Sequence, residues 1–461
     1  MKNVKCFFIL MLLSAQFVFA EALINYPPVK DITLPNGLRM LLIEKHEQQT
    51  ISYRILVKAA RADQPLGKEG IADLTSQLLQ EGTSTKTSDQ IADEIAAIGS
   101  QLSISPMPGY TIFGLDVLTE YSQTGLDILA EIILNPSFPS QGFKRVKNEM
   151  LNKVDMDLTD NDIIAFNHGR SLLLSCGNPL GRSNTKKSVQ SISLKDVRNF
   201  YQNHFLPNNS ILLVIGDFSN NQMLSQIKER FGSWKQGEVP NRVQTNPDFS
   251  KEGRIRIVDK PGMTQAVIYM NQWAPTSKSA YYYDYLIANY ILGGGDFSSR
   301  LTNAVRSKGG MTYSIGSFCN IHSSYGVLNI STSTRNQELF NAYNMIKAEI
   351  EKLDANGIIS DELQQAQEYI SGSIPLQLEA PPQIANKILN SFMQSFSIDD
   401  LSKEVINFNN VTIDGVNSVI KKYMQTEMLN VVIVCDVKKV ESQLKQIGNY
   451  EKINYKNSPC K

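Results

Sequence analysis

Hydrophobic and polar residues alternate with the spacing of a helix in the stretch GIADLTSQLLQEGTST, which runs from Gly70 to Thr85. Residues three or four apart lie on the same side of a helix, so this spacing defines two strips along it. The apolar strip consists of Ile71, Leu74, Leu78 and Leu79. The polar strip consists of Asp73, Ser76, Gln77 and Gln80. The pattern predicts an amphipathic helix whose polar strip is exposed or faces a cleft.

The same kind of unit occurs twice along the chain. Residues Ile192–Asp217 align without a gap on Val411–Asp436, shifted by 219 positions. Each segment has the pattern of an amphipathic helix, a short polar turn and an apolar strand that ends in Asp. Chance similarity of two such units is the alternative interpretation. We interpret the pair as an internal repeat, which divides the chain into two related halves.

Each half also begins with strand patterns. Apolar runs flank the turn residues Asn36-Gly37 in DITLPNGLRMLLIEK, and RIRIVDKPGMTQAVIYMNQW alternates with period two. Long helical patterns follow, among them NAYNMIKAEIEKLDANG, in which Gly357 is placed to end the helix. Strands grouped apart from helices indicate an α+β fold.

Between the halves, the stretch from Lys235 to Gly253 is rich in Pro, Asn, Gly and charged residues and is typical of a surface linker. We therefore predict an N-terminal domain over residues 24–236, a linker over 237–253 and a C-terminal domain over 254–445. Residues 446–461 are predicted to form a tail.

The first twenty residues, MKNVKCFFILMLLSAQFVFA, have two early lysines, an apolar run and a small residue at the end. This is the pattern of a cleavable signal peptide, residues 1–20, with an uncleaved membrane anchor as the alternative. No later segment is long and apolar enough to span a membrane. We expect a periplasmic or secreted protein with no membrane span after signal removal.

Charge and cysteine content narrow the possible partners and sites. The 45 basic and 45 acidic residues balance, and no basic block predicts nucleic-acid binding. The four cysteines that follow the signal allow three disulfide pairings, and none lies in a C-x-x-C pair. They are Cys176, Cys319, Cys435 and Cys460. Cys435 lies in the apolar run NVVIVCD, and we interpret it as a buried free thiol.

Several segments together resemble the pitrilysin/insulinase-type zinc metallopeptidases, in particular their bacterial short-chain, processing-peptidase-like branch. They occur in order between about Leu34 and Asp436, which is nearly the whole mature chain. The segments are LPNGLRMLLIEKH, VKAARADQPLGKEGIADLTSQLLQEGT, NPLGR, FYQNHFLPNNSILLVIGDF, FGSWKQGEVP and GGGDFSSRLTNAVRSKGGMTYS. The resemblance implies two homologous α/β-sandwich domains, each a mostly antiparallel sheet with packed helices. Together they would form one half of a clamshell.

The zinc motif of that family is degenerate here. Active members carry H-x-x-E-H on the helix that matches residues 70–82, where two imidazoles bind zinc and the glutamate acts as a base. The matching positions are Asp73, Ser76 and Gln77. The later glutamate ligand matches Lys153, or Val154 if the register shifts by one, and an ammonium group has no lone pair for a metal. We expect no zinc to be bound by this chain, although a harder ion held by Asp73 and Gln77 remains an alternative.

The histidines do not replace the missing ligands. His46, His168, His204 and His322 have no histidine partner at helical spacing.

The C-terminal half keeps more of the family pattern. In GGGDFSSRLTNAVRSKGGMTYS, the resemblance assigns substrate binding and catalysis to Arg306 and Tyr313. From the residues alone, a serine at 298 or 299 begins a helix, Gly309-Gly310 end it, and a strand runs on from Met311. A guanidinium can bind a substrate carbonyl or carboxylate, and a phenol can donate to an oxyanion. The purely structural alternative is an arginine at a helix end and a half-buried tyrosine.

The resemblance therefore implies a subunit that is inactive alone. Its partner would be a zinc-bearing homologous peptidase subunit, and its substrates would be unfolded peptides lying along an edge strand near residues 99–105. One alternative is a catalytically inactive peptide-binding or scaffold protein of the same fold. Another is an independent peptidase with an unusual metal site.

Overall fold

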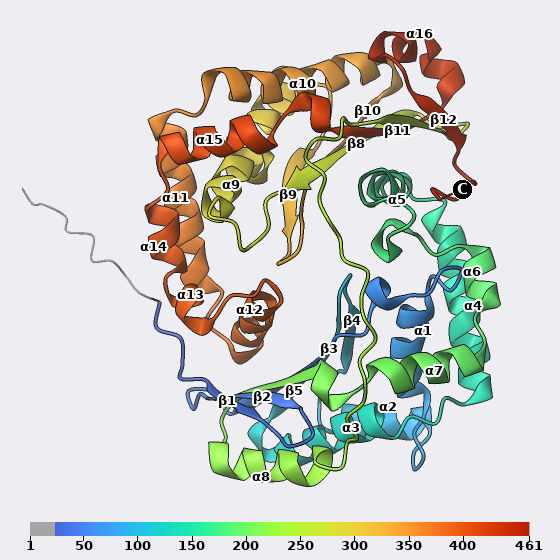
Figure 1. Cartoon of the computed structure of the whole chain (residues 1–461), viewed down its shortest axis with the longest axis vertical. Helices are drawn as coiled ribbons and strands as arrows, with labels where there is room; N and C mark the ends of the chain where they lie inside the picture. Colours follow the sequence, from blue (N-terminus) through green and yellow to red (C-terminus); the bar gives the residue numbers. More distant parts are fainter. Residues whose placement is uncertain (1–23, 461) are drawn as a thin grey trace, which may run out of the picture.

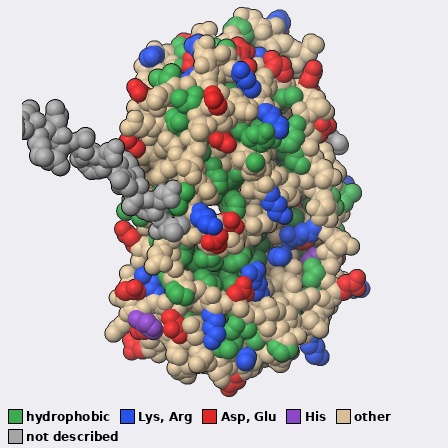
Figure 2. Space-filling view, turned by 60° about the vertical axis from the view of Figure 1, so that its left-hand side comes forward, with side chains coloured by type: hydrophobic (Ala, Val, Ile, Leu, Met, Phe, Trp, Pro, Cys, Tyr) green, Lys and Arg blue, Asp and Glu red, His purple; other side chains and the backbone are tan. Residues whose placement is uncertain are grey.

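The computed structural model describes residues 24–460, so the predicted signal peptide lies outside the described residues. Two six-stranded sheets lie at opposite ends of an elongated molecule, and each carries a layer of helices on its outer face (Figure 1). The face turned forward in Figure 2 is hollowed near mid-height, where hydrophobic side chains gather. The fold is thus a mixed α/β arrangement of two sheets with packed helices.

The N-terminal sheet has the strand order β1-β2-β6-β3-β5-β4. Neighbouring strands are antiparallel except for the parallel pair β2 and β6. Gly37, with φ +87°, makes the turn predicted between β1 and β2. The strands are β1 (Lys30–Thr33), β2 (Arg39–Glu44), β3 (Thr50–Val57), β4 (Ser103–Pro106), β5 (Thr111–Leu118) and β6 (Ser210–Gly216).

The C-terminal sheet repeats this arrangement with the order β12-β7-β11-β8-β10-β9. The pairs β7–β11 and β7–β12 are parallel, and the remaining pairs are antiparallel. The strands are β7 (Ile255–Asp259), β8 (Gln265–Ala274), β9 (Ile315–Ile321), β10 (Gly326–Arg335), β11 (Asn430–Cys435) and β12 (Glu451–Asn454).

The predicted repeat is confirmed. The segment 192–217 forms α7 and β6, and the segment 411–436 forms α15 and β11 at the same place in the second sheet. Gly357 ends α10 with φ +69°, as predicted. One boundary was wrong: the strand expected from Met311 begins only at Ile315, because the intervening residues fold back on the preceding helix.

Helices of the N-terminal half cover the outer face of its own sheet, where they bury one large apolar cluster. They are α1 (Ile71–Leu78), α2 (Ser88–Ala97), α3 (Ser122–Leu134), α4 (Ser140–Asp157), α6 (Lys186–Ser191), α7 (Leu194–His204) and α8 (Asn220–Phe231). A matching cluster forms over the C-terminal sheet. Its helices are α9 (Tyr282–Asn289), α10 (Leu339–Asn356), α11 (Ser360–Leu376), α14 (Glu404–Asn409), α15 (Ile413–Tyr423) and α16 (Val437–Ile447).

The inner face of each sheet is covered by a helix from the other half. Helix α5 (Asn161–Leu174) packs Ile164, Ala165 and Leu172 against strands β7, β8 and β11 of the C-terminal sheet. Helix α12 (Pro381–Met393), followed by α13 (Ile398–Ser402), packs on strands β2, β3 and β6 of the N-terminal sheet. In Figure 1, α5 and α12 lie between the two sheets on opposite sides of the molecule. This reciprocal exchange joins the halves through two apolar interfaces.

The linker and a disulfide also connect the halves. The linker runs from one end of the molecule to the other (Figure 1), and its Arg242 makes two hydrogen bonds of 2.7 Å to the Asp63 carboxylate.

The disulfide joins Cys176 to Cys460, and Cys319 and Cys435 are free. The free, buried Cys435 confirms that prediction. The segment 446–461, expected to be a tail, contributes edge strand β12 and the bonded Cys460, because β7 offers an open edge for pairing.

We expect Gly169→Ala to destabilise the protein although alanine is favoured in helices. A Cβ atom at Gly169 would overlap the ring of Tyr269, which is buried and donates a hydrogen bond to Asn329. Overpacking of this kind costs about 1–3 kcal/mol, which exceeds the helix-propensity gain of about 1 kcal/mol. Thermal and denaturant unfolding measure the difference.

Gly372→Ala in α11 is the matched control, because nothing lies within 4 Å of a Cβ there. It should be neutral or stabilising. Equal effects of the two substitutions would contradict close packing of α5 on the second sheet.

Candidate functional site

Helix α1 presents the predicted polar strip, but the strip is mostly closed. Gly70, with φ +105°, turns the chain into the helix. Asp73 and Ser76 are 7% and 1% exposed, and Gln77 is half-buried. The strip was predicted to be exposed or to face a cleft, and this holds for Gln80, which is exposed. It is wrong for Asp73 and Ser76, because polar groups of the same chain contact their side chains.

Those partners already use the side chains at the zinc-motif positions. Arg61 Nη2 donates to Asp73 Oδ2 at 3.2 Å, and Asn184 Nδ2 donates to the same oxygen at 3.4 Å. The Ser76 hydroxyl donates to the carbonyl of Ala72, 2.9 Å away in its own helix. The carboxylate at these three positions, that of Asp73, is therefore already ion-paired, and none of the three residues is a histidine.

Lys153 lies on α4, at the position that matches the family's glutamate ligand. Its ammonium group makes an ion pair of 3.0 Å with Asp157 on the same helix, and 68% of its side chain is exposed. The neighbouring Val154 is buried. Zinc is bound by imidazole, thiolate or free carboxylate groups. The positions offer the ammonium of Lys153, the hydroxyl of Ser76, the amide of Gln77 and a carboxylate, that of Asp73, which is already paired with Arg61. The residues present therefore do not fit a zinc ion.

The described part of the chain, residues 24–460, also contains no group of three or more His, Cys, Asp or Glu side chains placed to hold a metal. The histidines serve other roles. His46 contacts Asp217 at 2.7 Å on the surface. Burial and the charge of Arg256 lower the pKa of His168 to about 3, so this ring stays neutral at physiological pH.

The C-terminal motif folds as predicted in outline, with an unusual helical geometry. Residues Tyr290–Gly294 and Thr302–Lys308 each form a π-helical turn, a rare conformation that is frequent at functional sites. Gly310, with φ +63°, ends the second turn, and its amide donates to the carbonyl of Arg306 at 3.0 Å. The following residues lead into β9.

Arg306 and Tyr313 come from this motif and are open to a partner. The guanidinium of Arg306 lies 4.6 Å from the ring centroid of Phe297, which is itself 71% exposed. Tyr313 is 87% exposed. Within residues 24–460, neither side chain forms an ion pair or side-chain hydrogen bond, and the two do not bond to each other. Both groups therefore remain free to bind a molecule from outside.

A first cavity, of about 500 Å³, lies between α4, α5, the segment 182–187 and Tyr455–Pro459. Its lining includes Lys153 and also Arg61 and Asn184, the two residues that bond to Asp73 of α1. Neither Arg61 nor Arg170 was predicted to be a site residue. The sequence feature that could have indicated Arg170 is a basic residue within a helical segment that also contains several apolar residues.

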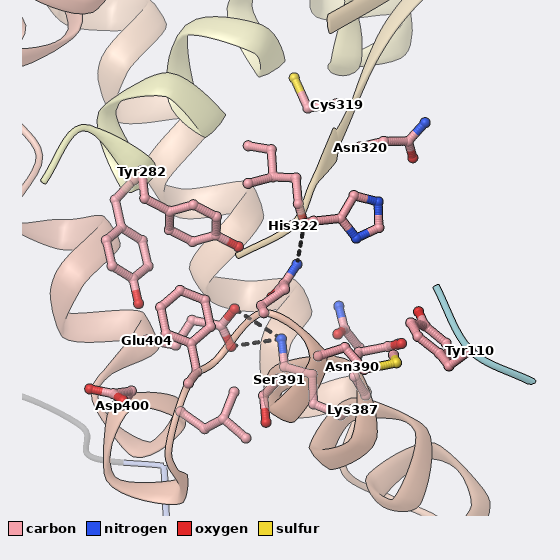
Figure 3. Close-up of a pocket in the computed structure, with 17 residues that line it drawn as sticks. Tyr110, Tyr282, Cys319, Asn320, His322, Lys387, Asn390, Ser391, Asp400 and Glu404 are labelled. Carbon is pink, nitrogen blue, oxygen red and sulfur yellow. Dashed lines mark hydrogen bonds and ion pairs between the residues drawn. The ribbon is translucent and has the colours of Figure 1, made fainter. Parts of the chain in front are cut away.

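The second cavity, of about 340 Å³, lies between α12, β9 and the segment that contains α13 and α14 (Figure 3). Lys387 and Glu404 point toward each other there and form an ion pair of 2.7 Å. Tyr110 reaches the same cavity from the N-terminal half. Asp400 also lines this cavity, so its wall carries one carboxylate in addition to the Lys387–Glu404 pair.

Edge strands are available in both halves. The strand predicted near residues 99–105 forms as β4, which lies at the edge of the N-terminal sheet beside α1. Strand β9 occupies the equivalent edge of the other sheet and leads away from Tyr313.

Two duplicated α/β units, a helix face whose donor groups do not fit zinc and a separate arginine–tyrosine motif occur together in this fold. Residues 39–168 match the model "Insulinase (Peptidase family M16)", and residues 191–370 match "Peptidase M16 inactive domain". The chain belongs to the insulinase-like peptidase family M16, which confirms the resemblance. Among the helices of residues 24–460, none combines the length and apolar character needed to cross a membrane.

Relatives and solved structures agree with this assignment. The chain is 25% identical to the "Uncharacterized zinc protease YmxG" of Bacillus subtilis, over 76% of this chain and 85% of the relative. It is 24% identical to the "Non-peptidase homolog YmxG" of Helicobacter pylori, over 80% and 85%. A crystal structure titled as a peptidase M16 inactive domain from Pseudomonas fluorescens matches with a TM-score of 0.82 at 20% identity, over 88% of this chain and 97% of that one.

We expect the purified chain to retain far less than one zinc ion after incubation with equimolar Zn²⁺ and desalting. The reason is the donor set: the one carboxylate is bound to Arg61, and no imidazole is nearby. Mass-spectrometric metal analysis measures the ratio, with Asp73→Asn as a control that should retain equally little. One zinc per chain that is lost in Asp73→Asn would show that the family's metal face still works.

Proposed function

We propose that this chain is the non-metal-binding subunit of a heterodimeric zinc peptidase. It supplies Arg306 and Tyr313 to substrate binding and oxyanion stabilisation at the zinc site of a homologous partner, and it is inactive alone. Support comes from family membership, from the similarity to a protein named a non-peptidase homolog, and from the donor set on α1, which does not fit zinc.

The observation that carries the proposal is a contrast between the two motifs. At three of the positions that the resemblance assigns to the zinc motif, Asp73, Ser76 and Lys153, the side chain is bonded to a group inside the chain. Arg306 and Tyr313, in contrast, are kept free of polar partners within residues 24–460, and Tyr313 is 87% exposed. Phe297 of the same motif, over which the Arg306 guanidinium lies, is 71% exposed as well, and two exposed aromatic rings in one motif favour a contact with another molecule.

The chemistry of the two groups suits a peptide substrate. A guanidinium offers a planar fork of donors to a backbone carbonyl or a carboxylate. A phenol donates to the oxygen that becomes negative when a peptide carbonyl is attacked. Neither group can activate water, so the attack depends on the partner's zinc.

We also propose that the mature chain works in the periplasm or outside the cell. The apolar leader of residues 1–20 supports this location. The disulfide between Cys176 and Cys460 supports it independently, because such bonds persist in oxidising compartments.

A scaffold or peptide-binding role without catalysis is the second candidate. One observation favours it: Arg306 lies over Phe297, and no bond between Arg306 and Tyr313 holds the pair in a shared catalytic geometry. Co-purification with an active zinc-bearing homologue distinguishes the two functions.

We expect Arg306→Ala and Tyr313→Phe each to lower kcat of the reconstituted pair by about 100-fold or more, as loss of an oxyanion donor does in other hydrolases. The assay mixes this chain with its zinc-bearing homologue and follows cleavage of an unfolded peptide. Tyr369→Phe, which removes another exposed phenol from the same half, is the matched control and should leave the rate unchanged. An unchanged rate in both test variants would remove the assignment.

A further inference from the structure

The cavity of about 500 Å³ lies close to the helix face at which the family's metal ligands would be expected, because Arg61 and Asn184 of its lining bond to Asp73 of α1. Its walls come from both halves of the chain: α4, α5 and the loop before α6 on one side, and Tyr455–Pro459 on the other. In Figure 1, these helices and the C-terminus lie together at one side of the molecule. The volume is in the range that holds a small ligand or the end of a peptide.

The charge of the lining is strongly positive. Seven lining side chains are basic, and one, Asp157, is acidic. Four of the basic groups have a carboxylate partner: Arg61 with Asp73, Lys153 with Asp157, Arg182 with Glu69, and Lys186 with Asp155. The other three, Arg170, Lys187 and Lys456, form no ion pair with any residue between 24 and 460.

Arg170 is the least compensated of these charges. Its Nη2 atom donates to the carbonyl of Arg182 at 2.9 Å and to the Ser183 hydroxyl at 3.1 Å, which are neutral acceptors. Its Nε atom is buried without a partner, and so is the Nε atom of Arg61. Burial and the nearby charge of Arg61 lower the pKa of Arg170 to about 10. A buried cation without an anion is unfavourable, and an anionic ligand would relieve that penalty.

The remaining lining is mixed: polar side chains such as Asn167 and Ser183 lie beside a group of apolar ones. The apolar group consists of Ile163, Ile164 and Phe166 of α5, Val154 of α4 and Leu158 directly after α4. A phosphate ion would gain nothing from these walls, whereas a carboxylate attached to an apolar group would use both the walls and the arginines. Guanidinium groups also match the planar geometry of a carboxylate.

We infer that this cavity binds a carboxylate carried by an apolar group, and specifically the free C-terminus of a peptide that ends in a large apolar residue. Arg170 and Arg61 hold the carboxylate, and the α4 and α5 walls hold the last side chain. Hydrolysis of a peptide bond creates one such carboxylate end. The binding site itself does not depend on the proposed function.

The test is calorimetric titration of the mature chain without any partner subunit, so its outcome is independent of heterodimer activity. The probe is an acetylated tetrapeptide that ends in Ala-Phe with a free carboxylate. We expect the same peptide with a C-terminal amide to bind at least 10-fold more weakly. Octanoate and inorganic phosphate are titrated for comparison. Octanoate would bind more tightly than the tetrapeptide at a fatty-acid site, and phosphate would do so at a site for simple anions. Tighter binding of either one than of the tetrapeptide would overturn the inference.

Substitutions locate the binding. Arg170→Gln and Arg61→Gln should each weaken the free-acid peptide at least 10-fold and leave the weak binding of the amide unchanged. Arg198→Gln, an exposed arginine on α7 outside the cavity, is the matched control and should have no effect. Because Arg170 is half-buried and its Nε atom is enclosed, Arg61→Gln keeps the test decisive if Arg170→Gln does not fold. Equal affinity for acid and amide, or wild-type affinity in the Arg61 variant, would overturn the inference.

Discussion

The structure depends on one packing constraint: each sheet has an apolar inner face on which a helix from the other half packs. Helix α5 buries apolar side chains on the C-terminal sheet, and α12 does the same on the N-terminal sheet. Burial of apolar surface is the main favourable term in folding, so neither sheet is stable with this face open. The two halves therefore fold as parts of one body, although the repeat makes each resemble a domain.

Helix α5 links this packing to the site. Gly169 lets the helix approach the ring of Tyr269, and the next residue, Arg170, extends into the cavity beside α1. The same helix thus fixes the interface between the halves and the position of a buried positive charge. At the face where an active relative would hold a metal cation, this chain has guanidinium groups, of which Arg61 is already paired with Asp73.

Local features were predictable from the sequence because neighbouring residues determine them. The turn at Gly37, the end of α10 at Gly357 and the duplicated helix–strand unit all follow from backbone preferences and hydrophobic spacing. The lack of histidine at residues 73, 76 and 77 could also be read from the sequence, because spacing on one helix is a local property.

Long-range packing was not predictable in the same way. The pairing of Cys176 with Cys460, the addition of β12 and the covering of the polar strip by Arg61 depend on which segments meet in space. In the sequence, Arg170 cannot be distinguished from other arginines in helices. Its place in a cavity with other basic side chains follows only from the fold. The exchange of α5 and α12 has no local signal, because a helical sequence pattern does not show which sheet the helix will cover.

The central claim is a division of labour, in which this chain lends Arg306 and Tyr313 to a metal centre held by another chain. The most direct measurement is a structure of the 1:1 complex with its zinc-bearing homologue and an uncleaved peptide. The account predicts that both side chains contact the peptide beside the partner's zinc helix. Side chains that face solvent on the outside of the complex, or homologues that do not associate, would contradict it.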